Sequence, residues 1–248
     1  MSRLFDGVPA HGLLLLALFA AALVAAPYLV SNYVLSVLII VLYFAYVGQA
    51  WNLMIGFAGA LSLGHALFVG IGAYASAALF IKFGIPPLIG VFVSIALSML
   101  MGYFIGYLGF RFSIHGVYFA LLTIAFAEFT GIMVDHTRWL GGTEGLFLPV
   151  SNRDSVDLIN LRGSPVMFYY IILTLTGCAL VLCRLLLNSK LGYYWQAIRE
   201  DQPAAEASGI HLFKYKMIAV AISSGMTGVA GVWYAFYYNN LFPESTFG

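Results

Sequence analysis

Residues 56–79 read "GFAGALSLGHALFVGIGAYASAAL", an almost entirely apolar stretch that carries five glycines. Crossing the hydrocarbon core of a membrane takes about 20 predominantly apolar residues, so this stretch is long enough to be a span. Small residues let membrane helices approach closely, which favours a tightly packed span. Irregular backbone at membrane depth is tolerated where it is buried in protein or lines a cavity, so an interrupted span that lines a path fits equally well. Both interpretations stay open at this point.

The rest of the chain has the same character, because 62% of its 248 residues are hydrophobic and only 8% are charged. So few charges cannot cover a soluble surface of that size, which makes lipid the natural solvent for most of the chain. A helix satisfies its own backbone hydrogen bonds, so it can cross lipid without leaving polar groups unpaired. We therefore expect an all-α polytopic transmembrane bundle, forming one domain over residues 1–248, with seven spans at about 11–30, 33–55, 59–81, 86–110, 114–135, 166–187 and 217–240.

The two ends of this pattern raise separate questions. The run from Gly12 to Val30 follows Arg3 and could be a cleaved signal peptide, but it is long for a signal core. It is nearly a full span, so we expect a retained first helix. Further along, Pro86 and Pro87 suit the start of the fourth span, where a missing N–H is harmless.

Charge balance and motifs exclude several classes of function. Eleven Lys and Arg against ten Asp and Glu leave a net charge of +1, so no nucleic acid partner is expected. Cys178 and Cys183 fall on different faces of one helix, and no CxxC or Cys/His cluster supports a metal site. The "GGTEG" at 141–145 lacks the Lys and the Ser or Thr of a phosphate-binding loop, and no nucleotide-binding signature occurs elsewhere. We expect neither a metal nor a cofactor.

Positive charges on the loops predict the orientation, because cytoplasmic loops carry an excess of Lys and Arg. If the N-terminus is cytoplasmic, seven of these residues lie inside and four outside. The long loop at about 136–165 then lies outside, and the segment at about 188–216 is cytoplasmic. The inside set is Arg3, Arg111, Arg184, Lys190, Arg199, Lys214 and Lys216, and the outside set is Lys82, Arg138, Arg153 and Arg162.

Polar residues inside the apolar runs are candidates for function, because ionisable groups are costly in lipid. Glu128 falls near the middle of the fifth span, and we expect it to face the bundle interior, either as a structural hydrogen-bond acceptor or as part of a path. Ser62 and His65 in the third span are open to the same two interpretations. The candidate residues for a translocation path are Gly59, Ser62, Gly64, His65 and Glu128.

Ser62 and His65 also raise the question of an intramembrane enzyme, since residues three apart on a helix can touch. No third orienting group follows in sequence, and neither a GxSxG elbow nor an HExxH motif occurs. We therefore expect no enzymatic activity and no catalytic residues.

The segment "YYWQAIREDQPAAEASGIHLFKYK", residues 193–216, concentrates charge in a chain that has little of it. Residues 192–200 predict one short helix with an apolar edge at Trp195 and Ile198. A second should begin with Asp201 or Gln202 as N-cap and Pro203 in its first turn, and end at Gly209. The alternative is a solvated loop with incidental helicity, but the agreeing caps and the apolar edge favour two packed helices.

Several blocks resemble one family in the same order along the chain: "AIREDQPAAEASGI" at 197–210, "WNLMIGFAGALSLGHALFVGIGAYASA" at 51–77, "GVYFALLTIAFAE" at 116–128 and "GGTEGL" at 141–146. The chain resembles the permease subunits of bacterial ABC importers, in particular branched-chain amino acid permeases of the LivM type, over about residues 33–245. The cytoplasmic loop of that superfamily carries Glu-Ala-Ala, three residues, then Gly. Ala204, Ala205 and Gly209 match it, and Pro203 stands where Glu is often found.

The resemblance implies an inner-membrane subunit that moves branched-chain or other hydrophobic amino acids by alternating access. Its implied partners are a second homologous permease, two cytoplasmic ATPase subunits, a periplasmic binding protein and the lipid bilayer. Such permeases usually continue with further helices, so we expect either a short natural form or a missing C-terminal part. The expected ATPase-coupling residues are Arg199, Glu200, Asp201, Ala204, Ala205 and Gly209, and the periplasmic-gate candidates are Gly141, Gly142 and Thr143.

Other functions stay open on the sequence. Relatives of such permeases suggest urea, short amides or aromatic acids as substrates. An ion-coupled secondary transporter would use Glu128 and His65 as titratable groups, and a purely structural membrane subunit would transport nothing.

Overall fold

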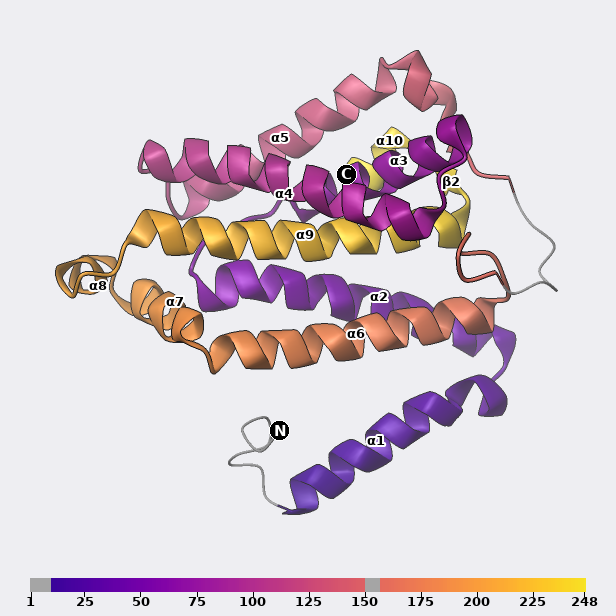
Figure 1. Cartoon of the computed structure of the whole chain (residues 1–248), viewed down its shortest axis with the longest axis horizontal. Coiled ribbons are helices and arrows are strands. Elements are labelled where there is room, and N and C mark those ends of the chain that lie inside the picture. The colour runs from indigo at the N-terminus through magenta and orange to yellow at the C-terminus, as the bar shows by residue number, and fades with distance from the viewer. Residues whose placement is uncertain (1–9, 150–156) are drawn as a thin grey trace.

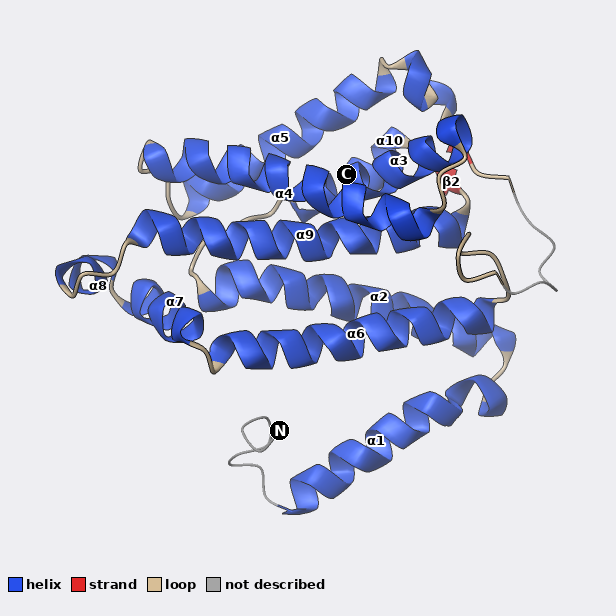
Figure 2. Ribbon diagram, viewed as in Figure 1, coloured by secondary structure: helices blue, strands red, loops and turns tan. Residues whose placement is uncertain are grey.

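The computed structural model describes residues 10–149 and 157–248, and most of this part of the chain is helical (Figures 1 and 2). Arg3 and Arg153, which support the predicted orientation, lie outside the described residues. In chain order the elements are α1 (Ala10–Leu29), α2 (Asn32–Asn52), η2 (Leu53–Phe57), α3 (His65–Phe83), α4 (Pro87–Arg111), α5 (Val117–Asp135), η3 (Arg138–Leu140), η4 (Gly142–Glu144), β1 (Leu146–Phe147), α6 (Pro165–Leu187), α7 (Lys190–Glu200), α8 (Gln202–Ala207), α9 (Leu212–Tyr238), β2 (Asn240–Leu241) and α10 (Pro243–Phe247).

The helices form the polytopic transmembrane bundle that the sequence predicts. Within the described ranges, six are long and apolar enough to cross a membrane, and the apolar part of α1, Leu14–Leu29, is shorter. The seven predicted spans correspond to six full-length candidates and one shorter apolar helix. The six candidates are Asn32–Phe57, His65–Phe83, Pro87–Arg111, Val117–Asp135, Pro165–Leu187 and Leu212–Tyr238.

Helix α1 lies apart from the other long helices (Figure 1). It is joined to α6 by two tyrosine hydroxyls, because Tyr169 donates to the Leu23 carbonyl at 2.7 Å and Tyr170 to the Val24 carbonyl at 2.9 Å. Large apolar side chains of α1 such as Phe19 are exposed. The first predicted span is therefore a peripheral helix of the bundle.

The centre of the bundle is the packing of α9 against α3 and α4, its two most extensive neighbours. Here the glycines of the third predicted span are needed for close approach. A methyl group added at Gly72 would lie 2.2 Å from the Gly228 carbonyl oxygen, and one at Gly231 would lie 2.1 Å from the Val69 carbonyl oxygen. Serine hydroxyls reinforce the contact, since Ser94 donates to the Gly72 carbonyl at 3.0 Å. Such small-residue interfaces replace the hydrophobic drive that lipid does not supply.

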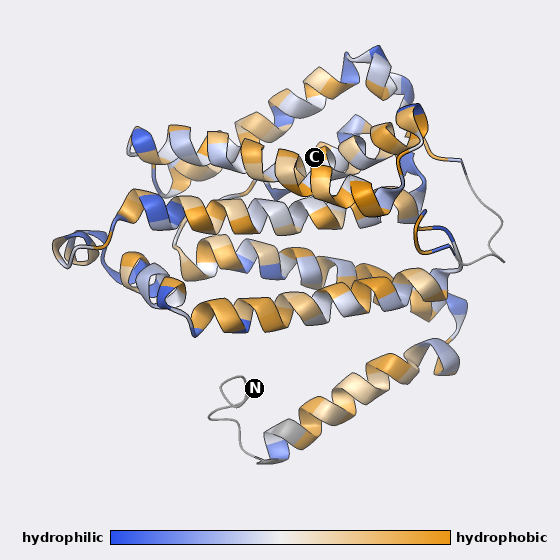
Figure 3. Cartoon of the chain, viewed as in Figure 1, coloured by the Kyte–Doolittle hydropathy of each residue, from blue (hydrophilic) through white to orange (hydrophobic). Residues whose placement is uncertain are grey.

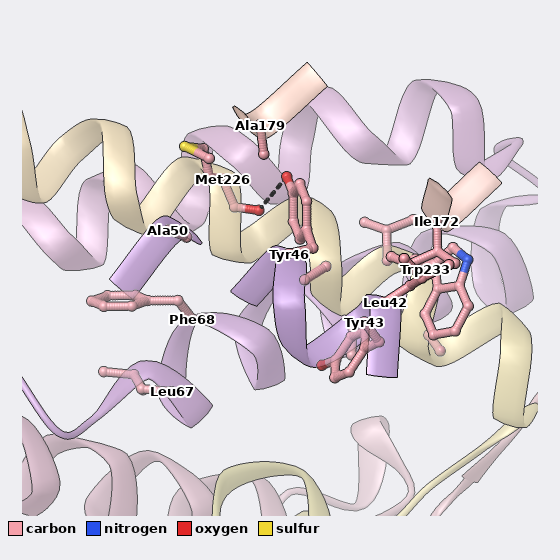
Figure 4. Packing of buried hydrophobic residues seen from close by; sticks show 14 of the residues in the cluster. Leu42, Tyr43, Tyr46, Ala50, Leu67, Phe68, Ile172, Ala179, Met226 and Trp233 are labelled. Carbon is pink, nitrogen blue, oxygen red and sulfur yellow. Dashed lines mark hydrogen bonds between the residues drawn. The ribbon is translucent and has the colours of Figure 1, made fainter. Parts of the chain in front are cut away.

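Aromatic residues of α2 contact α9, and α6 packs against α2 (Figure 4). Tyr43 stacks on Trp233 with ring centroids 5.3 Å apart, and the Tyr46 hydroxyl donates to the Met226 carbonyl at 3.0 Å. The Thr176 hydroxyl of α6 bonds the Leu42 carbonyl at 3.2 Å. These bonds satisfy polar groups that would be costly to bury unpaired.

The two ends of the bundle differ. Hydrophobic residues run along the long helices, whereas hydrophilic residues gather at helix ends and connecting segments (Figure 3). Helices α7 and α8 lie at one end, and the α5–α6 connection lies at the other, where β1 pairs with β2 in antiparallel register (Figure 1). After β2, α10 returns between α3 and α5, so that the Phe247 ring fills the space beside Gly70 and Gly131.

Two helix starts and the two cysteines bear on three further predictions from the sequence. Pro87 begins α4, as expected. The seventh predicted span begins earlier than predicted, at Leu212, so the end of the 188–216 segment belongs to α9. The first turns of α9 tolerate Lys214 and Lys216, because long basic side chains can reach the membrane interface. Cys178 is exposed and Cys183 is buried, so the two thiols lie on different faces as predicted.

Candidate functional site

The Gly-rich third predicted span is interrupted. Helix α2 passes into the short π-helix η2, and residues 58–64, here called the break, form no helix before α3 starts at His65. Gly59 has φ +67°, a conformation that favours glycine. In the break the regular helical hydrogen bonds cease, so the backbone carbonyls of η2 must find other partners. Of the two interpretations of these glycines, close packing therefore applies to α3 and interruption to the residues before it.

One side of the break is held by α5. The Leu63 amide donates to the Thr123 hydroxyl at 3.1 Å, and a methyl group added at Gly64 would lie 2.3 Å from the Thr123 carbonyl oxygen. The Trp51 indole N–H donates to the Ser62 carbonyl at 2.8 Å. Thus the break packs against protein on both sides, which is the condition for irregular backbone at membrane depth.

His65 is held by α9 at the point where the break ends. Its Nε2 lies 3.1 Å from the Ser223 hydroxyl, and that hydroxyl donates its single proton to the Ala50 carbonyl at 2.6 Å. Since Ser223 must then accept from the imidazole, Nε2 carries the proton and Nδ1 is an acceptor. Among the described atoms, the buried Nδ1 of His65 and the buried Ser62 hydroxyl have no hydrogen-bond partner. Ser62 and His65 are not bonded to each other.

The predicted pair of short helices is present at the end of the bundle, as α7 and α8. We call residues 190–209 the coupling segment, after the ATPase-coupling role that the family resemblance leads us to expect. Trp195 and Ile198 are fully buried, and the Trp195 indole donates to the Tyr215 carbonyl at 2.8 Å. The Asp201 side chain caps α8 by accepting from the Ala204 amide at 3.0 Å. The cap signals and the apolar edge in the sequence are therefore confirmed as two packed helices.

The C-terminal end of α8 closes through Gly209, whose φ is +83°. The Ile210 amide bonds the Ala205 carbonyl at 3.1 Å and the Gly209 amide bonds the Glu206 carbonyl at 2.9 Å. These two hydrogen bonds end the helix by turning the chain back, which requires the left-handed conformation that glycine adopts without strain. Ala205 is buried against the neighbouring helices, whereas Ala204 and Gly209 are exposed.

A cavity of about 1010 Å³ opens between the α4–α5 connection and the coupling segment. Its wall includes Lys216, whose ammonium donates to the Gln202 side chain at 2.9 Å and lies 5.5 Å from the centre of the Phe110 ring. This contact ties α8 to α9 and α4. Together with the exposed face of α8, the cavity gives this end of the bundle a recessed surface lined by both polar and apolar side chains.

The coupling segment and the break meet directly. The Arg199 guanidinium donates to the Gly56 carbonyl at 2.6 Å, although the two residues are 143 positions apart. Its stem covers Gly59, where an added methyl group would lie 3.3 Å from Arg199 Cγ. The guanidinium also pairs with Glu200 at 2.7 Å. We call the contact of Arg199 with Gly56 and Gly59 the junction.

Glu128 does not face the bundle interior, so that prediction is wrong for this chain. Its side chain is exposed on α5, while the buried face of the same helix carries residues such as Thr123, Ala127 and Gly131. On insertion scales a carboxylate in mid-membrane costs about 2.5–3.5 kcal/mol. Sequence periodicity could not assign the face, because apolar residues occur on every side of α5.

The gate candidates lie at the opposite end of the bundle from the coupling segment. Gly141 and Gly142 form consecutive left-handed turns with φ of 93° and 54°, and Thr143 is exposed. A methyl group at Gly141 would lie 2.4 Å from the Gly145 carbonyl oxygen, so the turn requires glycine. The structure therefore separates these residues from Ser62 and His65, which lie at the break.

Sequence reasoning missed several residues of the site. Thr123 and Ser223 hold the break and His65, but both read as ordinary small residues in apolar helices. Gly56 contributes a backbone carbonyl, which no sequence motif marks. In the part of the chain that the structure describes, no group of three His, Cys, Asp or Glu could hold a metal ion.

Comparison with known proteins identifies the family. The family model described as "Branched-chain amino acid transport system / permease component" matches residues 33–248. Two relatives are named high-affinity branched-chain amino acid transport system permease protein LivM, from Escherichia coli (strain K12) and Salmonella typhimurium (strain LT2). Each is 29% identical to the chain over 254 residues, covering 94% of this chain.

The same alignments cover 59% of each relative, so the chain spans less than two thirds of their length. No solved structure matches the chain. The family match nevertheless includes α2 to α10, and with them the break, the junction and the coupling segment. The chain belongs to the family of permease components of branched-chain amino acid transport systems.

Proposed function

We propose that the chain acts as a permease subunit of an ATP-driven importer in the inner membrane. It would move branched-chain or other hydrophobic amino acids by alternating access. Its partners would be a second homologous permease, two cytoplasmic ATPase subunits and a periplasmic binding protein. The chain would serve as one transmembrane permease domain, with the N-terminus and the coupling segment in the cytoplasm. Family membership supports the transport role, and the names of the relatives support the substrate class.

The observation that carries the mechanism is the junction. Helix α8 presents an exposed outer surface at the end of the bundle, and α7 extends from it to the break through Arg199. A partner that moves α8 would thus move a group bonded to the interrupted span. Coupling between two sites requires such a physical connection between elements that move.

In this mechanism the coupling residues have different roles. Ala204, Gly209 and Glu200 form the exposed docking surface, whereas Asp201 and Ala205 hold α8 in shape. Arg199 transmits the movement to Gly56. The path would pass Gly59, Ser62, Gly64 and His65, which lie in or next to the break. The unpaired Ser62 hydroxyl and His65 Nδ1 support this path, because a passing polar solute could bond them.

The experiment that tests the docking surface compares two tryptophan substitutions. Ala204→Trp blocks the exposed face of α8, and Thr143→Trp is the matched control, since Thr143 is also exposed but belongs to the α5–α6 connection, away from α8. We expect ATPase subunits to co-purify with the wild type and the control, and to be lost from Ala204→Trp. Full retention of the ATPase by Ala204→Trp would contradict the docking surface.

Uptake measurements test the energy source and the substrate. With all partners present, we expect radiolabelled leucine, isoleucine or valine to enter proteoliposomes only when ATP is supplied. Uptake without an ATPase that collapses with the proton gradient would instead indicate an ion-coupled transporter. Competition by urea, short amides or aromatic acids tests the other substrate classes.

A further inference from the structure

A second cavity, of about 560 Å³, opens where α2 and α6 begin and α9 ends, at the end of the bundle opposite α7 and α8 (Figure 1). Small-molecule sites usually measure about 300–1,000 Å³ and combine an apolar wall with a few polar groups. The cavity has that size, and nothing in the proposed function uses it.

Packed aromatic side chains form one wall of this cavity. Phe168 and Phe236 are buried, and Tyr237 stacks on Trp233 with ring centroids 4.8 Å apart. The Phe168 ring meets the Tyr237 ring edge-on, with centroids 5.5 Å apart. Because these rings already hold one another in place, the wall can receive an apolar group without first being ordered.

Arg162 adds a cation to the lining of the cavity. Its guanidinium lies 5.1 Å from the centre of the Phe80 ring, and among the described residues it donates no hydrogen bond and forms no ion pair. Asp157 is near enough to act on it electrostatically, but the Asp157 carboxylate accepts from Ile159 and Asn160 instead. A guanidinium presents its donors as a planar fork that fits a carboxylate. The cavity therefore holds an unused cation suited to a carboxylate.

The remaining polar lining suits a zwitterion. Asn32 and Asn239 line the cavity, and side-chain amide oxygens can accept from an ammonium group. No Asp or Glu of the described ranges lines it, so its charge favours a solute that carries a carboxylate. The lining thus matches a hydrophobic amino acid in three parts: a guanidinium for the carboxylate, amide oxygens for the ammonium group and aromatic rings for the side chain.

The cavity stands at one end of the contact between α2 and α9. From there the contact runs through the stacked rings of Tyr43 and Trp233. Further along, Ser223 of α9 bonds the Ala50 carbonyl of α2 and also His65. The cavity and the break thus lie along the same pair of helices, so a solute that parts α2 from α9 would pass from one to the other.

We propose that this cavity binds the transported hydrophobic amino acid before it enters the bundle, with its carboxylate on Arg162 and its side chain against Phe168 and Tyr237. The identity of the solute rests on the proposed function. The requirement for a carboxylate on an apolar body rests on the cavity itself, and it separates amino acids and aromatic acids from urea and short amides.

Equilibrium binding of radiolabelled leucine to the full chain in phosphatidylcholine nanodiscs tests the cavity. Arg162→Gln removes the guanidinium, and Arg138→Gln is the matched control, since Arg138 also belongs to the α5–α6 connection but does not line the cavity. We expect Arg162→Gln to raise the Kd at least about tenfold and Arg138→Gln to change it less than about twofold. Arg162→Lys, which keeps the charge but not the fork, should fall between the two. No saturable binding by the wild type, or equal affinities of the two glutamine variants, would overturn the proposal.

Leucinol identifies the group that Arg162 holds, because it carries a hydroxymethyl group in place of the carboxylate of leucine. The wild type should bind leucine at least about tenfold more tightly than leucinol, and Arg162→Gln protein should bind the two alike. An equal preference for leucine in both proteins would overturn the proposal. So would loss of leucine binding on adding phosphatidylglycerol to the nanodiscs without competition by phenylacetate, since that result indicates a lipid-phosphate site.

ATP-driven uptake separates this proposal from the proposed function. If the complete wild-type importer takes up no leucine with ATP, the proposed function fails, and the binding measurements still decide the role of the cavity. If the wild type takes up leucine and Arg162→Gln protein binds and transports it equally well, the cavity is not the binding site.

Discussion

The α3–α4–α9 core and the junction both join segments far apart in the sequence, but they are held in different ways. In the core, backbone meets backbone through glycines, and added side chains have no space. At the junction, one partly exposed guanidinium bonds one carbonyl and covers Gly59. Close-packed interfaces resist deformation, whereas a single side-chain contact can join two elements that move relative to the core. The difference shows which contacts are close-packed backbone and which depend on one side chain, and under the proposed function the second kind would transmit motion.

The largest expected effect is on the core. Gly72→Leu should prevent α3 and α9 from packing, because the added carbon meets the Gly228 carbonyl rather than a flexible side chain. Overpacking costs about 1–3 kcal/mol, and a backbone clash should reach at least the upper value. The yield of monodisperse protein in detergent measures the resulting loss of folded protein. Gly48→Leu is the control, since no atom lies within 4 Å of a methyl group there; equal yields would show that the core is not close-packed.

At the junction we expect a loss of coupling with the fold preserved. Arg199→Ala leaves the Gly56 carbonyl without its donor and should lower the free energy of unfolding by only about 1 kcal/mol. Substrate-stimulated ATP hydrolysis should fall roughly tenfold, in the usual range of coupling free energies. Lys82→Ala removes an exposed basic side chain at the C-terminal end of α3, outside the junction and the docking surface, and should change hydrolysis little. If Arg199→Ala protein keeps the substrate-stimulated ATP hydrolysis of the wild type, the junction does not couple the two segments.

The end of α8 should show an intermediate effect. Gly209→Val places a β-branched residue at φ +83°, and the left-handed conformation costs about 1–2 kcal/mol for a residue with a Cβ. Since nothing lies within 4 Å, the strain is in the backbone alone. Asn tolerates this conformation better, so Gly209→Asn should retain most stimulated ATP hydrolysis while Gly209→Val loses it. If both variants hydrolyse ATP and transport normally, α8 does not couple to the ATPase.

The smallest effect is expected at Ser62. Its buried hydroxyl has no partner in the described chain, so Ser62→Ala should leave thermal stability unchanged or raise it slightly. Ser223→Ala, in contrast, removes bonds to His65 and Ala50 and should cost about 1–3 kcal/mol. If Ser62 lines the path, its Ala variant transports more slowly despite its stability. Unchanged uptake would remove Ser62 from the path.

Local signals predicted much of the fold. The apolar runs indicated the spans, Pro87 indicated the start of α4, and Asp201 and Gly209 indicated the ends of α8. Each signal acts over a few neighbouring residues, so it can be read without knowing what the segment packs against.

The missed features depend on distant contacts. The junction joins Arg199 to a backbone carbonyl 143 positions away, and a carbonyl has no sequence signature. The exposed face of α5 depends on which helices surround it, so hydropathy could not place Glu128. Lys216 was assigned to a loop because of its charge, yet its ammonium reaches Gln202 from within α9.

The most direct test of the account replaces the non-covalent junction by a disulfide. A Cβ at Gly59 would lie 3.5 Å from that of Arg199, at the lower limit of about 3.5–4.5 Å for disulfides. The measurement is ATP-driven uptake by Gly59→Cys/Arg199→Cys in a background with Cys178→Ala and Cys183→Ala. If α7 and the break move together, the oxidised protein should regain the uptake that Arg199→Cys alone loses, and reduction should abolish it again. Cross-linked protein that transports no better than the reduced form would contradict the account.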